Sequence, residues 1–541
     1  MPAPAPTLAD STILGAGPTD LRRRHSKQTF MPAVHEPRKT PQDEPSGGAT
    51  IRIPSLFDAL LPLACLIGLL TLSVYLFGSD SSYGPNQVAL IFCSAVASLV
   101  ALKNGHRWQH ISDAISNGIT VAIGAMLILL SVGALIGTWM LSGTVPALIH
   151  YGLQVLNPSF FYAATCLICA VVATAIGSSW TTAGTIGVAL MGIAIALGLS
   201  PEIAAGAIIS GSYFGDKMSP LSDTTNLASA VVGTELFTHI RHMMWTTGPS
   251  FLIALFLFAM VGIYATPSAD SASLAETSAT LAASFNLSPI TLLPVILLIW
   301  LALRRVPALP TILAGAALGG VLAVLLQPER VVELAAAPEL PRGLALLKGV
   351  WTALFGGYSA ATGNATVDAL LSRGGMLAFL NTIFLILTAL SFGAVMDHTG
   401  LLERIISGVL RVARSTGSLI ASVVGTTILS NIVTADQYMS IVIPGRMFRE
   451  EFRRRRLKAR NLSRTIEDAG TLTSSLVPWN SGGAYMAATL GVATLAYLPF
   501  CFLNLINPVV AIIYGVRGIK LDRYDDDELI PAIDEDPRLT R

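Results

Sequence analysis

Long apolar runs alternate with short polar stretches between residues 54 and 515. A run of roughly 17 to 25 apolar residues can cross the hydrocarbon core of a membrane as one helix. The pattern predicts apolar segments near 54–78, 85–102, 117–141, 158–176, 185–199, 243–265, 289–303, 307–326, 375–397, 417–433 and 495–515. We therefore expect an all-α polytopic membrane protein.

One polar stretch, residues 210–226, interrupts this pattern between long apolar segments. It contains the carboxylates Asp216 and Asp223 and the cation Lys217. Its helix-breaking residues are Gly211, Gly215 and Pro220. We expect unwound backbone here, which at membrane depth is tolerated only where it is buried in protein or lines a wet cavity. Such a break predicts a binding site.

The second half of the chain repeats this order of segments at an offset of about 255 residues, which indicates an internal duplication. The matching segments are 144–156 with 399–414, 177–184 with 430–437, and 210–226 with 471–483. The first amphipathic segment has no Lys or Arg, whereas the second has Arg404, Arg411 and Arg414. Because basic residues favour the cytoplasmic side, the two copies are expected to face opposite ways. Inverted repeats with paired broken segments are typical of transporters and place the site near the bilayer midplane.

Composition and charge agree with a membrane location. Of the 541 residues, 52% are hydrophobic and 12% charged, whereas about 25% charged is usual in soluble domains. The N-terminal stretch is basic and has no apolar run, so we expect a disordered tail and a cytoplasmic N-terminus. The expected divisions are 1–50, this tail; 51–265, the first transmembrane half with repeat 1; 266–373, connecting loops and spans; 374–516, the second transmembrane repeat; and 517–541, a cytoplasmic tail.

Several shorter segments carry expectations of their own. Residues 235–242 are expected to form a loop or interfacial segment, 266–288 an external stretch, and 327–373 a long loop. The stretch 419–444 is expected to form a hairpin, because the basic run after it favours the cytoplasmic side.

For the isolated histidines and for the cysteines, the sequence favours structural roles over functional ones. His150, His239 and His398 are expected near the membrane interfaces, in snorkelling or capping roles. Asp397 is expected to end its span. All five cysteines lie in apolar segments, where a free Cys packs as a small hydrophobe.

The second copy supplies further site candidates. Asp436 is the best carboxylate candidate there, with Asn431 and Thr434 as oxygen ligands, because an ionisable group at membrane depth is functional by default. Capping of a hairpin is the alternative for Asp436. Glu467 and Asp468 are explained equally well by capping a helix N-terminus and by ion binding.

Two features of the first copy also leave alternatives open. Lys217 could form a structural ion pair with one of the two nearby aspartates, since intramembrane charges usually pair. The small and hydroxyl-bearing residues of 177–184 suit helix packing as well as a site.

Several motifs resemble the signature of NhaC-type sodium/proton antiporters. They are GSYFGDKMSPLSDTTNLA at 211–228, TADQYMSIVIPGRMF at 434–448, LSRTIEDAGT at 462–471, PWN at 478–480 and AATLG at 487–491. The resemblance covers residues 55–515. It implies an ion-transporter-superfamily fold of two inverted repeats, each with a re-entrant hairpin and a broken transmembrane helix. The chain departs from the family pattern at 481–483, where Ser-Gly-Gly replaces Thr or Ser followed by Cys-Gly.

The resemblance implies exchange of sodium for protons across the inner membrane. Sodium requires several hard oxygen ligands, and burial raises whereas a nearby cation lowers the pKa of a carboxyl group, so that proton and sodium can compete for one carboxylate. The candidate ion or proton ligands are Asp216, Asp223, Thr224, Thr225, Asn226, Ser178, Thr181, Asn431, Thr434, Asp436 and Asn480. The candidate substrate-binding or charge-pairing residues are Lys217 and Arg446.

Two other hypotheses remain open. The first keeps the fold and makes the protein a sodium-coupled exchanger of small carboxylates or amino acids, of the malate or lactate kind. The second is a membrane hydrolase with a Ser219–Lys217 pair, which is disfavoured because the sequence has no metal-binding His cluster, nucleophile elbow or phosphate loop. We expect no enzymatic activity, no cofactor and no nucleic-acid partner. The expected partners are Na⁺, H⁺ and the lipid bilayer, and a homodimer is compatible with such a fold.

Overall fold

The computed structural model describes residues 51–264, 271–410 and 413–525. In these ranges nine helices are long and apolar enough to cross a membrane, or up to eleven if each of two bent pairs counts as one span. The bent pairs are Ser273–Ser284 with Pro289–Leu303, at 94°, and Ser481–Leu490 with Thr494–Phe500, at 89°. The prediction of an all-α polytopic membrane protein is therefore confirmed. The expectations for residues 1–50, for Arg411 and for residues 526–541 lie outside the described residues.

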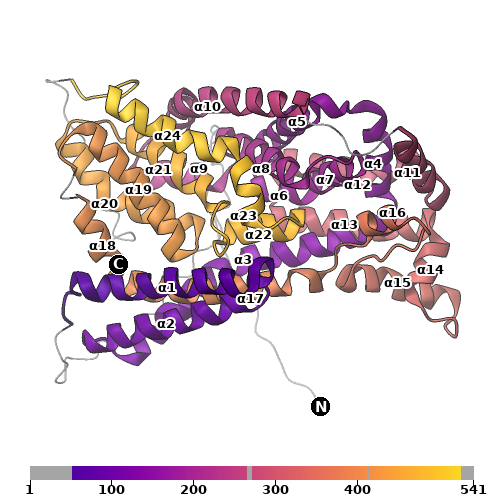
Figure 1. The fold of residues 1–541 in the computed structure, drawn as a ribbon, viewed down its shortest axis with the longest axis horizontal. Coiled ribbons are helices and arrows are strands. Elements are labelled where there is room, and N and C mark those ends of the chain that lie inside the picture. The colour runs from indigo at the N-terminus through magenta and orange to yellow at the C-terminus, as the bar shows by residue number, and fades with distance from the viewer. Residues whose placement is uncertain (1–50, 265–270, 411–412, 526–541) are drawn as a thin grey trace, which may run out of the picture. The chain divides into compact units, whose positions relative to one another are not determined.

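The described chain is built from helices throughout (Figure 1). The first half contains α1 Leu56–Phe77, α2 Pro85–Lys103, α3 Trp108–Leu141, α4 Thr144–Val155, α5 Phe161–Ile176, α6 Ser179–Thr182, α7 Val188–Ala196, α8 Pro201–Met218, α9 Asp223–Val232 and α10 Leu236–Tyr264. The middle contains α11 Ser271–Ser284, α12 Leu293–Leu303, α13 Ala308–Leu326, α14 Pro328–Ala335, α15 Arg342–Gly356 and α16 Ala365–Leu371. The second half contains α17 Leu380–His398, α18 Leu401–Leu410, α19 Thr416–Thr434, α20 Gln437–Arg454, α21 Ala459–Ser474, α22 Ser481–Leu490, α23 Thr494–Tyr497 and α24 Phe502–Arg517.

The order of elements is the same in the two halves. The short amphipathic helices α4 and α18 each follow a long apolar helix, and each is followed by another, α5 or α19. Gly177 after α5 and Ala435 after α19 are both left-handed, with φ of 75° and 55°, and each precedes the N-cap of a new helix. Later in each half comes a helix that is broken in two, which is α8–α9 in the first half and α21–α22 in the second.

Four local expectations are wrong. Of the two alternatives for residues 235–242, the loop is wrong, because α10 begins at Leu236. The loop expected at 327–373 contains the helices α14, α15 and α16. The span expected at 495–515 is divided, because α23 ends at Tyr497 and α24 begins only at Phe502. His239 neither snorkels nor caps, because it is buried inside the protein and neither of its ring nitrogens has a partner among the described residues.

The expected unwinding at Gly211 and Gly215 is also wrong, because α8 runs through both residues and ends only at Met218. Both glycines instead allow α8 to lie directly against α5. A Cβ at Gly211 would overlap the carbonyl oxygen of Cys166, and one at Gly215 that of Ala170. Small residues that let two helix backbones approach closely are a common means of packing helices in membranes. This contact fixes the C-terminal end of α8, which carries Asp216.

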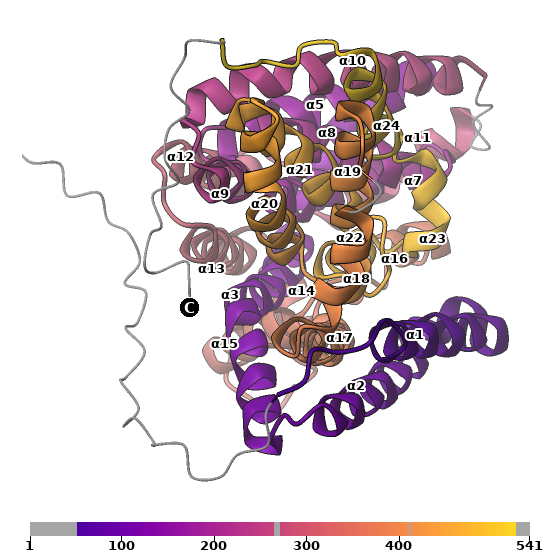
Figure 2. The same cartoon turned by 90° about the vertical axis from the view of Figure 1, so that its left-hand side faces the viewer.

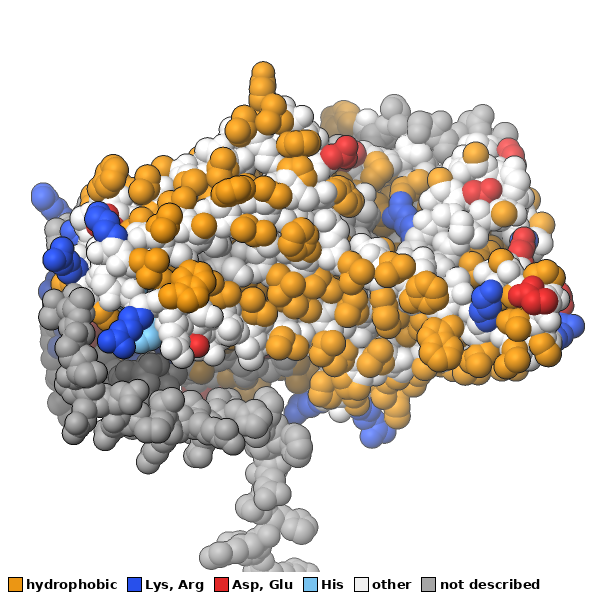
Figure 3. All heavy atoms as spheres, turned by 90° about the horizontal axis from the view of Figure 1, so that it is seen from below, with side chains coloured by type: hydrophobic (Ala, Val, Ile, Leu, Met, Phe, Trp, Pro, Cys, Tyr) orange, Lys and Arg blue, Asp and Glu red, His pale blue; other side chains and the backbone are white. Residues whose placement is uncertain are grey.

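The two broken helices lie next to each other in the core. Helix α21 contacts both α8 and α9, and α20 contacts α9 and α21, as both views of the ribbon show (Figures 1 and 2). Helices α19 and α20 also pack on each other, which agrees with the expected hairpin at 419–444. Hydrophobic side chains cover much of the face seen in Figure 3. Exposed large apolar residues on this and other surfaces, such as Phe57, Leu252 and Trp351, suit contact with lipid acyl chains.

Candidate functional site

The first break separates α8 from α9 at residues 219–222. Ser222 caps α9 and accepts a hydrogen bond from the Thr225 amide at 3.3 Å. Asn226 donates its side-chain amide to the carbonyl of Pro220 at 3.1 Å and to that of Ser222 at 2.6 Å. These bonds satisfy backbone groups that the break leaves without helical partners. Asn226 thus holds the break together and is exposed, whereas the sequence analysis proposed it as an ion ligand.

Asp216 lies in the last turn of α8 and is only 3% exposed. Its Oδ2 accepts hydrogen bonds from the amide of Ser179, at 3.1 Å, and from the hydroxyl of Ser179, at 2.7 Å. Its Oδ1 is buried and has no partner among the described residues. Ser179 begins α6 directly after the left-handed Gly177, so the polar interruption at 177–184 places the donors of Asp216.

A cavity of about 590 Å³ brings three of the predicted carboxylates together. Its polar and charged lining residues are Ser178, Ser179, Thr181, Asp216, Asp223, Arg305, Thr311, Asp436, Gln437, Tyr438 and Ser481. The remaining lining residues include apolar side chains of α3, the Trp180 side chain and Leu221. Asp216 and Asp223 come from the two sides of the first break, and Asp436 comes from the second half of the chain.

The other two aspartates of the cavity also have protein partners. The hydroxyl of Tyr438 donates to Asp223 Oδ2 at 2.5 Å, and Asp223 is exposed. Asp436 caps α20 by accepting a hydrogen bond from the Met439 amide at 2.8 Å. It also lines a second cavity, of about 240 Å³, together with Asp397, His398 and Thr434. Asp436 therefore combines the capping role and the cavity position that the sequence analysis weighed against each other.

The amide candidates of the second half lie within the protein and bond to each other. The Asn480 side chain donates to the backbone carbonyl and to Oδ1 of Asn431, both at 3.0 Å. Asn431 donates to the Gly470 carbonyl at 2.7 Å. The Thr434 hydroxyl donates to the Ser430 carbonyl at 2.8 Å. These contacts tie α19 to the second break and leave Asn431 and Asn480 outside the lining of either cavity.

The remaining candidates of the first half have similar structural partners. The Thr225 hydroxyl donates to the Lys217 carbonyl at 3.2 Å. The Thr181 hydroxyl donates to that of Ser178 at 3.1 Å, at the rim of the first cavity. Arg446 is exposed on α20 and lines neither cavity.

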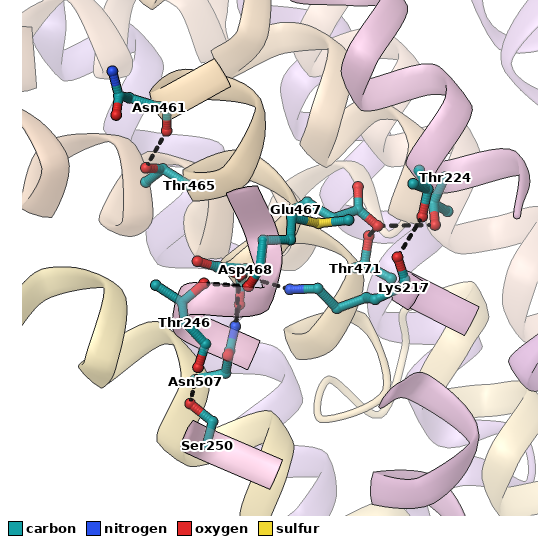
Figure 4. A network of polar contacts seen from close by, with 12 residues as sticks. Lys217, Thr224, Thr246, Ser250, Asn461, Thr465, Glu467, Asp468, Thr471 and Asn507 are labelled. Carbon is teal, nitrogen blue, oxygen red and sulfur yellow. Dashed lines mark hydrogen bonds and ion pairs between the residues drawn. The ribbon is translucent and has the colours of Figure 1, made fainter. Parts of the chain in front are cut away.

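A second group of charges lies outside the lining of either cavity, and Figure 4 shows its contacts. Lys217 Nζ pairs with Asp468 Oδ1 at 2.6 Å, with both side chains fully buried. Asn507 donates to the same oxygen at 2.8 Å. The neighbouring Glu467 accepts from the hydroxyls of Thr224, at 3.1 Å, and Thr471, at 2.8 Å. We call these residues the buried cluster.

The buried cluster corrects two expectations. Lys217 pairs with neither Asp216 nor Asp223, because its partner Asp468 comes from the other half of the chain. Glu467 and Asp468 cap no helix N-terminus, since both lie in the interior of α21, whose N-cap is Lys458. Among the cavity-lining residues that the sequence analysis missed, three bond to an aspartate or carry a charge. These are Ser179, Tyr438 and Arg305, and their only signal in the sequence is that each lies in a polar segment or turn.

Comparison with known proteins decides the family. A model of the Na⁺/H⁺ antiporter family matches residues 211–519, which include the breaks in both helices. The chain belongs to this family. A second model, of the C4-dicarboxylate anaerobic carrier family, matches residues 24–267.

Relatives in this family carry different cargoes by name. The chain is 40% identical to the Na⁺/H⁺ antiporter NhaC of Alkalihalophilus pseudofirmus, over 81% of this chain and 91% of the relative. It is 37% identical to the arginine/ornithine antiporter ArcD of Halobacterium salinarum, over 88% and 94%. It is 36% identical to the malate-2H⁺/Na⁺-lactate antiporter of Bacillus subtilis, over 86% and 96%. The three are named as antiporters, in agreement with the resemblance found in the sequence.

Proposed function

We propose that this protein exchanges Na⁺ for H⁺ across the membrane and that Asp216 is the group for which the two ions compete. The observation that supports this most directly is the state of the Asp216 carboxylate. It is buried, one of its oxygens is held by Ser179, and the other has no partner among the described residues although the side chain lines a cavity. No cation is paired with it in the described residues.

A buried carboxylate in this position needs either a proton or a cation to remove its charge. Taking an isolated ionised carboxylate out of water costs several kcal/mol in real proteins. Hard oxygen ligands suit Na⁺, and the lining of the cavity includes the hydroxyl-bearing residues Ser178, Ser179 and Thr181 in addition to Asp216. Because one carboxylate cannot hold both ions, binding of Na⁺ releases the proton.

The matching order of elements in the two halves supports an alternating-access cycle. We propose that the halves are inverted repeats, so that movement of one against the other exposes Asp216 to each side in turn. The basic residues in the chain favour a cytoplasmic N-terminus in the inner membrane of the cell.

Proton flux in proteoliposomes tests the proposal. The protein is reconstituted with an internal pH dye, and external NaCl, LiCl, KCl or choline chloride is added. The variants Asp216→Asn, Asp223→Asn and Asp436→Asn each remove one charge from the cavity, and Asn keeps the capping ability of Asp436. Asp113→Asn, at an exposed position of α3, is the matched control. We expect Na⁺-driven flux in the wild type and the control, and none in Asp216→Asn.

Exchange of an organic solute is the second candidate function, and the size of the cavity favours it. Pockets for small organic ligands measure about 300–1,000 Å³ and are mostly apolar with a few polar groups. The cavity, at about 590 Å³, fits this range. Arg305, from the turn between α12 and α13, also lines it and could bind a carboxylate. Lys217 and Arg446 do not line the cavity, so Arg305 replaces them as the candidate cation.

The same proteoliposomes separate the two functions. If flux begins only after malate, lactate or arginine is added, Na⁺ is a coupling ion and the cargo is organic. In that case Arg305→Gln should abolish exchange of a carboxylate-bearing solute. If Na⁺ alone drives the flux and Arg305→Gln leaves it intact, the first function holds.

A further inference from the structure

The buried cluster holds three ionisable side chains, and the buried Arg464 lies one turn before Asp468 on α21. Its ionisable residues are Lys217, Glu467 and Asp468, and each of their side chains is fully buried. Lys217 pairs with Asp468 at 2.6 Å, and this pair carries no net charge. Glu467 is the one of the three that forms no ion pair with an opposite charge among the described residues.

The contacts of Glu467 do not supply that charge. Its Oε1 accepts hydrogen bonds from two neutral hydroxyls, of Thr224 and Thr471. Its Oε2 is buried without a partner among the described residues. An ionised carboxylate in such a place is strongly disfavoured, whereas a protonated one carries no charge that needs a partner. Glu467 does not line the large cavity, so it is separate from the place where Asp216 meets the ions.

We propose that Glu467 binds a second transported proton, so that each Na⁺ is exchanged for more than one H⁺. This inference rests on the proposed exchange of Na⁺ for H⁺. Asp216 remains the group shared by the two ions, and Glu467 carries only a proton.

The position of Thr224 connects Glu467 to movement of the broken helix. Thr224 is the second residue of α9, directly after the break, whereas Thr471 lies on the same helix as Glu467 and four residues away. When α9 shifts against α21, the bond from Thr224 is lost while that from Thr471 stays. Thr224 is thus a positioning residue that closes over Glu467 in the conformation described here, and its departure lets the proton leave.

The number of protons exchanged per Na⁺ tests this inference. Proteoliposomes are loaded with a pH dye, ²²Na⁺ uptake and proton flux are measured together, and the membrane potential is set with potassium and valinomycin. An exchange of two protons for one Na⁺ moves net charge, so the potential drives it, whereas one-for-one exchange is insensitive to the potential. We expect two protons per Na⁺ and a potential-driven flux for the wild type. Glu467→Gln should keep Na⁺-driven flux with one proton per Na⁺ and no response to the potential.

Glutamine matches the shape and neutrality of a protonated glutamate, so Glu467→Gln keeps the cluster uncharged and folded. Glu276→Gln, at an exposed position of α11, is the matched control and should behave as the wild type. A wild-type ratio of one, or a ratio of two that persists in Glu467→Gln, would overturn the inference while leaving Na⁺/H⁺ exchange in place. Loss of all Na⁺ transport in a folded Glu467→Gln protein would also overturn it, because Glu467 would then bind the sodium ion. Absence of Na⁺-driven flux in the wild type would instead refute the proposed function itself.

Discussion

The two groups of carboxylates beside the broken helices have similar residues but different surroundings. Asp216 borders a cavity, has a free oxygen and has no cation paired with it among the described residues. Asp468 lies in the buried cluster, where Lys217 and Asn507 contact one of its oxygens. Both carboxylates are buried, so burial alone does not distinguish an exchange site from a structural pair. What distinguishes them is access to the cavity and the presence of a partner of opposite charge.

Each of these two groups includes one residue from the end of helix α8, and the two residues are adjacent in the sequence. Asp216 and Lys217 are neighbours in the last turn of α8, and they point to different partners, Ser179 on α6 and Asp468 on α21. Any displacement of this turn acts on both groups at once. The end of α8 therefore links the proposed ion site at Asp216 to a contact between the two halves.

The largest expected effect is on transport and comes from Asp216→Asn. Flux should fall to that of protein-free liposomes, because the variant has no carboxylate for Na⁺ and H⁺ to share. Its unfolding midpoint in detergent should not fall, since no paired charge is lost. Scanning fluorimetry beside the flux assay checks both statements. A drop in the midpoint that matches the loss of flux would mean that Asp216 is structural.

Lys217→Met should have the opposite result to Asp216→Asn, because its main effect should be a loss of folding stability. It leaves Asp468 buried without its cation, and breaking a buried pair in this way costs about 3–5 kcal/mol. The double variant Lys217→Met with Asp468→Asn should recover most of that loss, because it leaves no uncompensated charge. Chemical or thermal unfolding of the three proteins measures the difference. Equal stability of Lys217→Met and the wild type would refute a structural role for the pair.

Gly215→Ala should have an intermediate effect. The added methyl group would overlap the Ala170 backbone on α5, and overpacking of this kind typically costs about 1–3 kcal/mol. The shift of α8 that relieves the overlap would also move Asp216, so Na⁺ affinity should fall as well. Gly68→Ala is the control, because nothing lies within 4 Å of the methyl group it adds to α1. If both variants behave alike, the contact between α5 and α8 does not position the site.

Tyr438→Phe should have the smallest effect. It removes one hydrogen bond to the exposed Asp223, worth about 1 kcal/mol or roughly fivefold in an equilibrium constant. We expect the Na⁺ concentration for half-maximal flux to change by no more than this factor. A complete loss of transport would place Asp223, rather than Asp216, at the centre of the site.

The apolar pattern was sufficient to predict most of the helices, because length and hydrophobicity decide what crosses a membrane. It failed where tertiary contacts override local preference. Gly211 and Gly215 read as helix breakers in the sequence, yet they serve a close helix contact within an intact helix. Only Pro220 marks the actual break, since it cannot continue the hydrogen bonding of a helix.

Part of the site could also be predicted from the sequence. The carboxylates stood out because charges are rare in apolar surroundings, and three of them do line one cavity. Their partners could not be read from the sequence. The residues Lys217 and Asp468 are separated by 251 positions, and Ser179 and Asp216 by 37, so only the packing of the helices brings them together. Hydroxyl and amide candidates such as Asn226 and Asn480 are common at helix ends, and their residue type does not separate capping from ion binding.

The most direct test of the account is whether Na⁺ binding releases a proton from Asp216. Na⁺ can be titrated into the detergent-solubilised protein in a calorimeter, in buffers with different enthalpies of ionisation, so that the heat reports the protons released. We predict that the wild type releases protons on binding Na⁺ and that Asp216→Asn neither binds Na⁺ nor releases protons. Na⁺ binding to the wild type without proton release, or unchanged release in Asp216→Asn, would contradict the account.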